Sequence, residues 1–180
     1  MIHTRHAHCP FPGMRTKRPA RLKTFSYVGV HRYSLTFCTN FRRNYFEDAA
    51  IVRLVLAQFL RVAEQEGFSI LAYCFMPDHL HLLIEGVRDD SDARKFITKG
   101  KQCSAHAYAK KFGKRLWQPF GYEHVLRTNE KAVIAARYIL QNPVRAGLVR
   151  TVLEYPFVGS QTYDIKEIIE GLGETRERLE

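Results

Sequence analysis

Residues Tyr73–Gly86 read Tyr-Cys-Phe-Met-Pro-Asp-His-Leu-His-Leu-Leu-Ile-Glu-Gly, two apolar runs separated by Pro77-Asp78. This pattern predicts two strands joined by a turn. Alternate side chains of a strand point to the same face, so we expect His79 and His81 to project together and Leu80 to point away. Two imidazoles at the start of a strand can chelate one divalent cation. The alternative is a strand whose exposed face happens to carry histidines.

The composition indicates one basic domain. The 180 residues are enough to bury a core, and 28 Lys and Arg against 18 Asp and Glu give a formal charge of +10. Such an excess favours a polyanionic partner, with nucleic acid first and an acidic membrane surface second. A basic protein without such a partner is the alternative.

The cysteines and the apolar runs indicate where in the cell the protein is expected. The four cysteines are far apart and show no CxxC spacing, which argues against a thiolate zinc site. Cys38 and Cys74 lie inside apolar runs, where reduced cysteines are typical. No stretch is long enough to span a bilayer, and the N-terminus lacks the apolar core of a secretory signal. We therefore expect a location in the cytoplasm or nucleoid and no membrane partner.

The two ends of the chain differ from its middle. Residues 1–24 are polar, basic and contain proline, which predicts a flexible arm. This arm can hold DNA phosphates through Arg18, Arg21 and Lys23, or be an idle tail. Residues 164–180 carry charges of both signs and predict a C-terminal helix. Residues 25–163 are expected to form the folded domain between them.

The apolar patterns predict the order strand, helix, strand, strand, helix, strand, helix. The strands are expected over residues 28–39, 68–76, 79–85 and 122–127, and the helices over 47–67, from 91 or 92 to about 112, and 130–141. This βαββαβ order indicates the α+β class and a ferredoxin-like fold, an antiparallel sheet with helices packed on one face.

The second helix and the aromatic loop after it are candidates for DNA contact. The helix is basic and offers Lys99 and Lys101, although a solvated face is the commoner reason for such charge. Trp117, Phe120 and Tyr122 offer surfaces on which bases can stack. For Trp117, core packing is the alternative.

The end of the third helix carries a further pair. Tyr138 and Asn142 are four residues apart, so they lie on one helical face. Pro143 should stop the helix, because a residue before proline avoids the helical region. The functional interpretation is a nucleophile and an oxygen ligand delivered to the two histidines. The alternative is a half-buried tyrosine and a C-capping asparagine.

Four segments together resemble the single-tyrosine HUH transposases, in which HUH denotes His, bulky hydrophobe, His. The nearest branch is the REP-associated tyrosine transposases, which are relatives of the small bacterial insertion-sequence enzymes. The resemblance runs from about Arg21 to about Tyr163 and is carried by Tyr73–Glu85, Leu116–Pro119, Glu123–Arg127 and Tyr138–Val149. It implies the ferredoxin-like fold, His79, His81 and Asn142 as metal ligands, and Tyr138 as the catalytic residue.

The resemblance also implies an activity. A protein of this family uses Mg²⁺ or Mn²⁺ to nick and rejoin single-stranded or hairpin DNA, which can include repetitive palindromic elements. The phosphodiester energy is kept in a 5′-phosphotyrosine, so that rejoining needs no ATP. Arg127, Arg137 and Arg145 are candidate phosphate contacts. Monomer and homodimer both stay open, because the tyrosine helix can serve its own histidines or a partner's.

Two other functions remain as alternatives. The first is a catalytically silent protein that binds DNA hairpins at repeats. The second is a metal-dependent hydrolase of small phosphoesters, with water in place of Tyr138 as the nucleophile. The net charge of +10 and the basic arm argue against this hydrolase.

Overall fold

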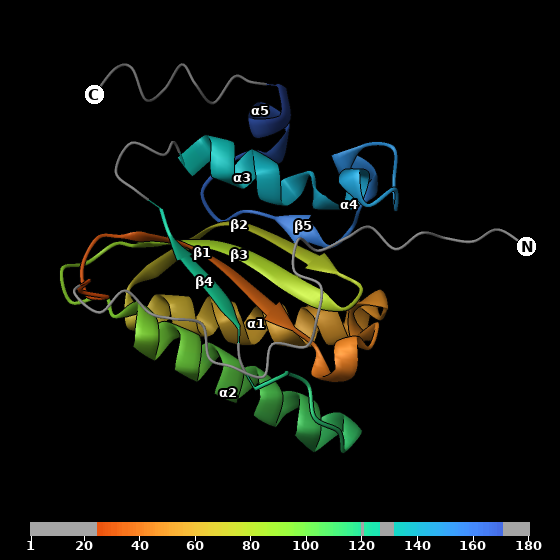
Figure 1. Cartoon of the computed structure of the whole chain (residues 1–180), viewed down its shortest axis with the longest axis horizontal. Coiled ribbons are helices and arrows are strands. Elements are labelled where there is room, and N and C mark those ends of the chain that lie inside the picture. The colour runs from red at the N-terminus through yellow and green to blue at the C-terminus, as the bar shows by residue number, and fades with distance from the viewer. Residues whose placement is uncertain (1–24, 120, 127–131, 171–180) are drawn as a thin grey trace, which may run out of the picture.

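A computed structural model of the chain describes residues 25–119, 121–126 and 132–170 (Figure 1). The predicted arm with Arg18, Arg21 and Lys23 lies outside the described residues, as do Phe120, Arg127 and positions 171–180 of the predicted C-terminal helix.

A five-stranded antiparallel sheet forms the middle layer, with strand order β4-β1-β3-β2-β5. The strands are β1 (Arg32–Cys38), β2 (Phe68–Met76), β3 (His79–Gly86), β4 (Tyr122–Val125) and β5 (Val158–Gly159). The first four have the order 4-1-3-2 that a βαββαβ chain gives, and β5 adds an edge. The predicted α+β, ferredoxin-like fold is confirmed.

The β2–β3 hairpin turns at Pro77-Asp78, as the sequence predicts. Met76 lies opposite His79 in the sheet, and Cys74 lies opposite His81. Directly opposed residues share a face, so the two histidines, Cys74 and Met76 lie on the same side. Leu80 is fully buried in the core on the other side. The predicted alternation of β3 is therefore confirmed.

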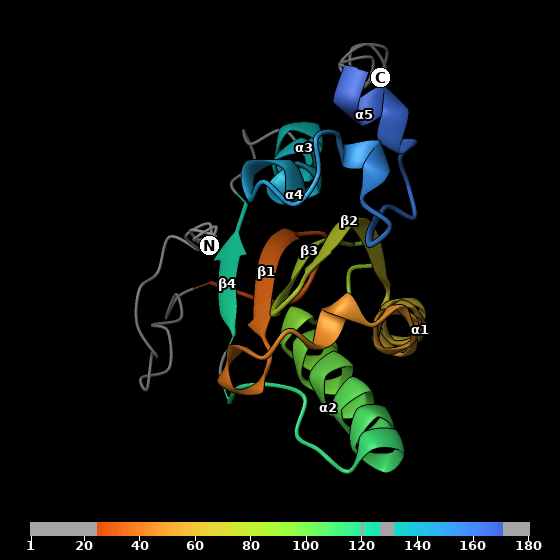
Figure 2. The same cartoon turned by 90° about the vertical axis from the view of Figure 1, so that its right-hand side faces the viewer.

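Two long helices cover the face that carries Leu80 (Figures 1 and 2). They are α1 (Ala49–Glu66) and α2 (Ala93–Phe112). The Asp48 carboxylate accepts from the Ala50 N–H at the start of α1, and Gly67 ends it with φ of +70°. The helices pack closely at Gly100, where a Cβ would come within 2.5 Å of the Phe59 ring. These are the two helices that the βαββαβ pattern places on one face.

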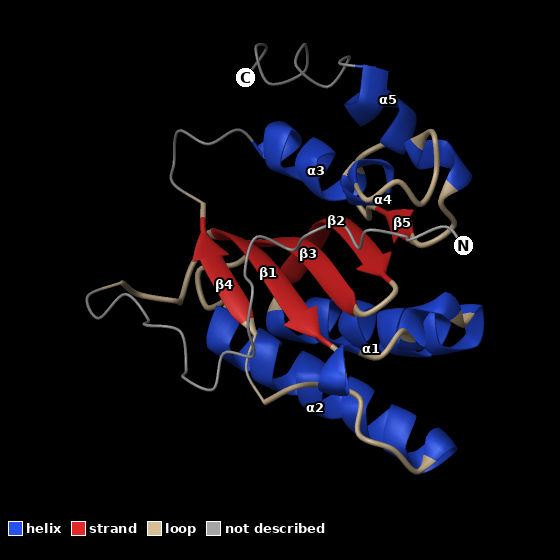
Figure 3. Ribbon diagram, turned by 45° about the vertical axis from the view of Figure 1, so that its right-hand side comes forward, coloured by secondary structure: helices blue, strands red, loops and turns tan. Residues whose placement is uncertain are grey.

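Three more helices lie on the opposite side of the sheet (Figures 2 and 3). They are α3 (Ala132–Leu140), α4 (Asn142–Arg145) and α5 (Ile165–Glu170). The first two lie next to the sheet, and α5 packs against α3. Ala136, Ile139 and Leu140 pack with Leu71 and Leu83 of the sheet to form a second core. The sheet is thus a middle layer, and α3 lies over the face that carries the histidines.

Short 3₁₀ segments complete the described chain: η1 (Asn40–Arg42), η2 (Tyr45–Glu47) and η3 (Val152–Glu154). Among the helices within the described ranges, none has the length and apolar character needed to cross a bilayer.

Candidate functional site

The two histidines of β3 form a close pair. The Nε2 atoms of His79 and His81 are 3.0 Å apart, and the rings meet edge to face. Two ligand atoms on adjacent corners of an octahedron with bonds of about 2.1 Å lie about 3.0 Å apart. The spacing of the two nitrogens therefore fits one divalent cation.

Each histidine is held by a partner on its other ring nitrogen. His79 Nδ1 lies 2.6 Å from Asp78 Oδ1, and His81 Nδ1 lies 3.0 Å from Thr36 Oγ1. Arg42 Nε in turn pairs with Asp78 Oδ2 at 2.8 Å. Such partners fix the ring orientation and tautomer of metal-binding histidines. With both Nδ1 atoms engaged, the two Nε2 atoms are the ones left to face a cation.

Burial and nearby charges keep His81 in the protonation state that a metal ligand requires. Burial, followed by the charges of His79, Arg145 and Arg42, lowers the pKa of His81 to about 3. His81 is therefore neutral at neutral pH, as a metal ligand must be. Burial alone would raise the pKa of the Asp78 carboxyl, but its hydrogen bond to His79 and the charge of Arg42 outweigh burial, and that pKa is lowered. Asp78 therefore stays ionised opposite His79.

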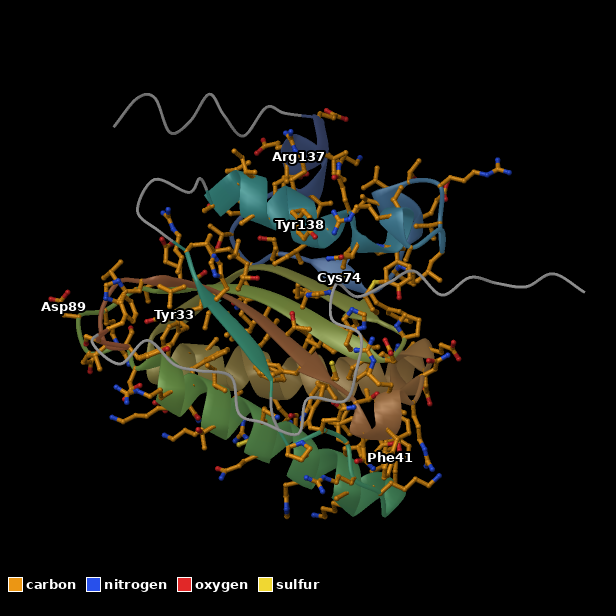
Figure 4. All side chains as sticks on the ribbon, viewed as in Figure 1. Tyr33, Phe41, Cys74, Asp89, Arg137 and Tyr138 are labelled. Atoms are coloured by element: carbon orange, nitrogen blue, oxygen red, sulfur yellow. The ribbon has the colours of Figure 1, made fainter. Side chains whose placement is uncertain are left out.

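Tyr138 lies on α3, on the same side of the sheet as the histidines (Figure 4). Its side chain is 58% exposed, which leaves it accessible to a large substrate. The guanidinium carbon of Arg145 lies 3.8 Å from the centre of the Tyr138 ring, and Arg145 Nη1 donates to the Tyr138 carbonyl oxygen at 2.9 Å. Tyr138 is therefore exposed, with Arg145 stacked on one face of its ring.

Asn142 is held by the same arginine. Its Oδ1 accepts from Arg145 Nη2 at 2.7 Å, and its Nδ2 donates to the Ile139 carbonyl oxygen at 2.9 Å. Within the described ranges, His, Cys, Asp and Glu side chains do not form a metal-binding cluster of three or more. Among the described residues, a third protein ligand would therefore be of another type. Coordination by Asn142 stays a prediction.

The chain does not stop at the proline as sharply as expected. Gln141 keeps a helical conformation, and α4 begins directly at Asn142 with Pro143 in its first turn. Proline is tolerated there because the first helical N–H groups have no partner within the helix. The short α4 turns Arg145 back toward Tyr138. Arg145 is also close enough to influence the pKa values of Cys74 and His81, so α4 reaches the histidine face.

The candidate DNA contacts on α2 lie away from the histidines. Lys99 and Lys101 belong to the helix on the opposite face of the sheet. Lys99 pairs with Glu66 at 2.6 Å. Lys101 Nζ donates to the carbonyl oxygens of Gln118 and Pro119, and burial lowers its pKa to about 8. The basic helix α2 therefore lies across the sheet from the histidines, and Lys101 supports the loop that follows it. DNA contact by Lys99 and Lys101 stays a prediction.

Trp117 and Arg137 also have structural roles. Trp117 is only 3% exposed, and its Nε1 donates to Ser104 Oγ at 2.9 Å. Its ring packs against Phe37, Phe46 and Phe59, so the proposal that it stacks on bases is wrong and core packing holds. Arg137 Nε donates to the Ile168 carbonyl oxygen at 2.8 Å, which ties α5 to α3.

The sequence reasoning missed three residues of this site: Thr36, Arg42 and Asp78. Asp78 directly precedes His79, and Thr36 lies on the outward face of the first predicted strand, so a signal existed for both. Thr36 is paired with His81 across the sheet, which needs the strand register to be seen. Arg42 lies in a basic stretch after the first predicted strand, and no other feature of the sequence singles it out.

Comparison with known proteins identifies the family of this chain. A sequence profile of the family described as "Transposase IS200 like" matches residues 27–142, well over half of the chain. The matched range contains the whole βαββαβ unit, including the histidine pair on β3. The chain belongs to the IS200-like transposase family.

Two individual proteins are similar to this chain in sequence. The chain is 30% identical over 98 residues to the REP-associated tyrosine transposase of Escherichia coli (strain K12), covering 54% of this chain and 58% of that protein. It is 27% identical over 110 residues to a Haemophilus influenzae protein provisionally described in the same way, covering 55% and 62%. The chain thus spans less than two thirds of either relative.

A solved structure shares the fold. The structure of a REP-associated tyrosine transposase bound to a REP hairpin superposes with a TM-score of 0.64 at 23% sequence identity. The superposition covers 77% of this chain and 81% of that one.

Proposed function

We propose that this protein is a metal-dependent DNA strand-transfer enzyme that nicks and rejoins single-stranded or hairpin DNA through a 5′-phosphotyrosine. The observation that carries the proposal is the His79–His81 pair, with Nε2 atoms 3.0 Å apart on the sheet face over which α3 lies; α3 also carries the exposed Tyr138. A pair of imidazoles that can hold a cation and a phenol that can reach the bound phosphate are the groups this chemistry requires.

His79 and His81 would hold the cation, with Asn142 as the predicted third protein ligand. Imidazole suits Mn²⁺ better than Mg²⁺, while Mg²⁺ is the more available ion, so both are proposed. A bound cation would withdraw charge from a non-bridging phosphate oxygen and orient the phosphorus. The engaged Nδ1 atoms and the neutral state of His81 support this assignment.

Tyr138 would supply the nucleophile. Its oxygen, having lost its proton, attacks phosphorus while the bond from phosphorus to the 3′ oxygen breaks. The departing 3′ oxygen takes up a proton and becomes a 3′-hydroxyl, and the 5′-phosphate stays esterified to Tyr138. Attack by the 3′-hydroxyl of another strand reverses the step, forms a new phosphodiester and returns the phenol.

The DNA substrate is inferred from charge and from the relatives. The formal charge of +10 favours a polyanion. Two similar proteins are described as REP-associated, and the structural neighbour is bound to a REP hairpin. We therefore propose hairpin DNA of repetitive palindromic elements as the partner, with the protein acting at the nucleoid.

The test uses short hairpin DNA from the flanks of the gene, with Mg²⁺ or Mn²⁺. A protein–DNA adduct that survives boiling should appear on a denaturing gel. It should require the metal and be absent from Tyr138→Phe and from His79→Ala. Hairpin binding by all variants without an adduct from the wild type would contradict strand transfer and favour the silent hairpin-binding protein. Cleavage that persists in Tyr138→Phe would favour a water nucleophile.

A further inference from the structure

The turn after β1 presents an aromatic side chain to water on a strained backbone. Phe41 has φ of +56° and Arg42 has φ of +55°, and the Phe41 side chain is 68% exposed. Residues with a Cβ rarely adopt this left-handed region, and two in succession are rarer still. The exposed ring gains no burial in return. Strain that the fold does not need for packing often marks a functional position.

The surrounding contacts hold this turn firmly. Thr39 Oγ1 lies 2.7 Å from the Arg43 carbonyl oxygen and 3.0 Å from that of Asp78. The Asn40 N–H donates to the Leu116 carbonyl oxygen at 2.7 Å. These bonds fix both ends of the turn, so the exposed ring sits on a rigid support.

The same contacts join the turn to the histidine site. Arg42 pairs with Asp78 at 2.8 Å, and Asp78 lies 2.6 Å from His79 Nδ1. Cys38, three residues before Phe41, is directly opposite His79 in the sheet. Three residues span at most about 10–11 Å, so the Phe41 backbone lies within that reach of the strand end beside His79.

The turn also carries positive charge. Arg42 and Arg43 follow Phe41, and both are exposed. Four residues after Phe41, the Tyr45 ring lies 5.2 Å from the Tyr108 ring on α2, the helix whose last turn carries Lys110 and Lys111. An exposed aromatic ring among cations is the combination that holds single-stranded nucleic acid, because bases stack on the ring while the cations hold the backbone.

We propose that Phe41 stacks on a nucleobase of the single-stranded DNA next to the phosphate held at the histidine site. Arg43 would contact the backbone near that base, while Arg42 keeps its pair with Asp78. The inference rests on the proposed function, since it assumes DNA at His79 and His81. It adds a contact that positions the strand and that lies outside the metal ligands and the nucleophile.

Phe41→Asn separates stacking from folding. Asparagine tolerates a positive φ, so this variant keeps or improves stability while it removes the ring. Affinity is measured for a hairpin with a single-stranded extension, in a Tyr138→Phe background in which no adduct forms. Val30→Asn is the matched control, because Val30 is 58% exposed and lies before the opposite end of β1.

We expect Phe41→Asn to weaken binding about 5- to 150-fold, the range for losing one base–aromatic stack, with an unchanged or higher melting temperature. Val30→Asn should bind as the parent does. Affinity equal to that of the parent in Phe41→Asn would overturn the inference.

A second variant keeps the test independent of any change in folding. Phe41→Trp places an indole at the proposed stacking position, and the one native tryptophan, Trp117, is buried. Stacking should quench the new fluorescence when the extension binds, whereas a hairpin without an extension should not. Equal spectra with both DNAs would overturn the inference. Because binding is measured without Tyr138, a failed adduct assay and a failed Phe41 test are distinguishable.

Discussion

Arg145 lies against Tyr138, with its guanidinium carbon 3.8 Å from the ring centre, and one of its nitrogens donates to Asn142 Oδ1 at 2.7 Å. One side chain thus links the proposed nucleophile to the predicted third ligand. Its charge also lowers the pKa of His81. Arg145 is therefore placed to set the relative positions of groups that come from two consecutive helices.

Replacing Arg145 with lysine should slow adduct formation about 10- to 100-fold, because a misplacement of about 1 Å can cost that much. Lysine keeps the charge but cannot stack on the ring and bond the amide in the same way. The rate is measured by quenching single-turnover reactions onto a denaturing gel. Arg150→Lys, at an exposed arginine, is the control. An unchanged rate in Arg145→Lys would show that the stack has no part in the reaction.

Thr36→Val should weaken metal binding about 10-fold or more, the usual effect of removing the outer partner of a metal-bound histidine. Valine keeps the shape of threonine but leaves His81 Nδ1 without the hydroxyl that now lies 3.0 Å away. The measurement is the Mn²⁺ concentration that gives half-maximal adduct. Ser34→Ala, on the same strand and face, should leave that concentration unchanged. Equal Mn²⁺ concentrations for Thr36→Val and the wild type would show that Thr36 does not support metal binding by His81.

Lys101 should make stability depend on pH in the alkaline range. Its folded-state pKa of about 8 lies below the ordinary value of 10.5, so the unfolded chain holds a proton more tightly than the folded one. Relative to Lys101→Met, the wild type should gain about 3 kcal/mol as the pH rises from about 8 to about 10.5, and lose it again as the pH falls. Urea denaturation across this range measures the difference. A constant difference would contradict the burial of Lys101.

Trp117→Phe should cost stability and leave DNA binding intact. The change removes a buried hydrogen bond to Ser104 and part of a ring packed among three phenylalanines, worth about 1–3 kcal/mol together. Thermal unfolding and hairpin affinity are measured on the same preparation. A large loss of affinity with unchanged stability would restore Trp117 as a stacking residue.

The sheet and the histidine pair could be predicted because both follow from local periodicity. The alternation of residues 79–85 decides which side chains share a face, and the break at Pro77-Asp78 decides where the hairpin turns. The helix caps at Asp48 and Gly67 are equally local. Tyr138 and Asn142 could be paired by helical spacing and by the family resemblance.

The contacts between distant segments could not be predicted in this way. Trp117 follows a polar, basic stretch, yet its loop is drawn into the core, where Phe37, Phe46 and Phe59 converge. Thr36 meets His81 only through the register of β1 with β3. Arg145 reaches Tyr138 because the chain stays nearly helical at Gln141, where the proline suggests a stop. Each of these depends on tertiary packing, which leaves no periodic signal.

The most direct test of the central claim locates the covalent bond. The adduct is trimmed with nuclease and digested with trypsin, which cuts after Arg137 and Arg145 and so isolates Tyr138 as the sole tyrosine of its peptide. Mass spectrometry should find residual nucleotide on residues 138–145, with fragments that place the phosphate on Tyr138. A phosphate on any other residue, or a cleaved strand with no modified peptide, would contradict the assignment of Tyr138 as the nucleophile.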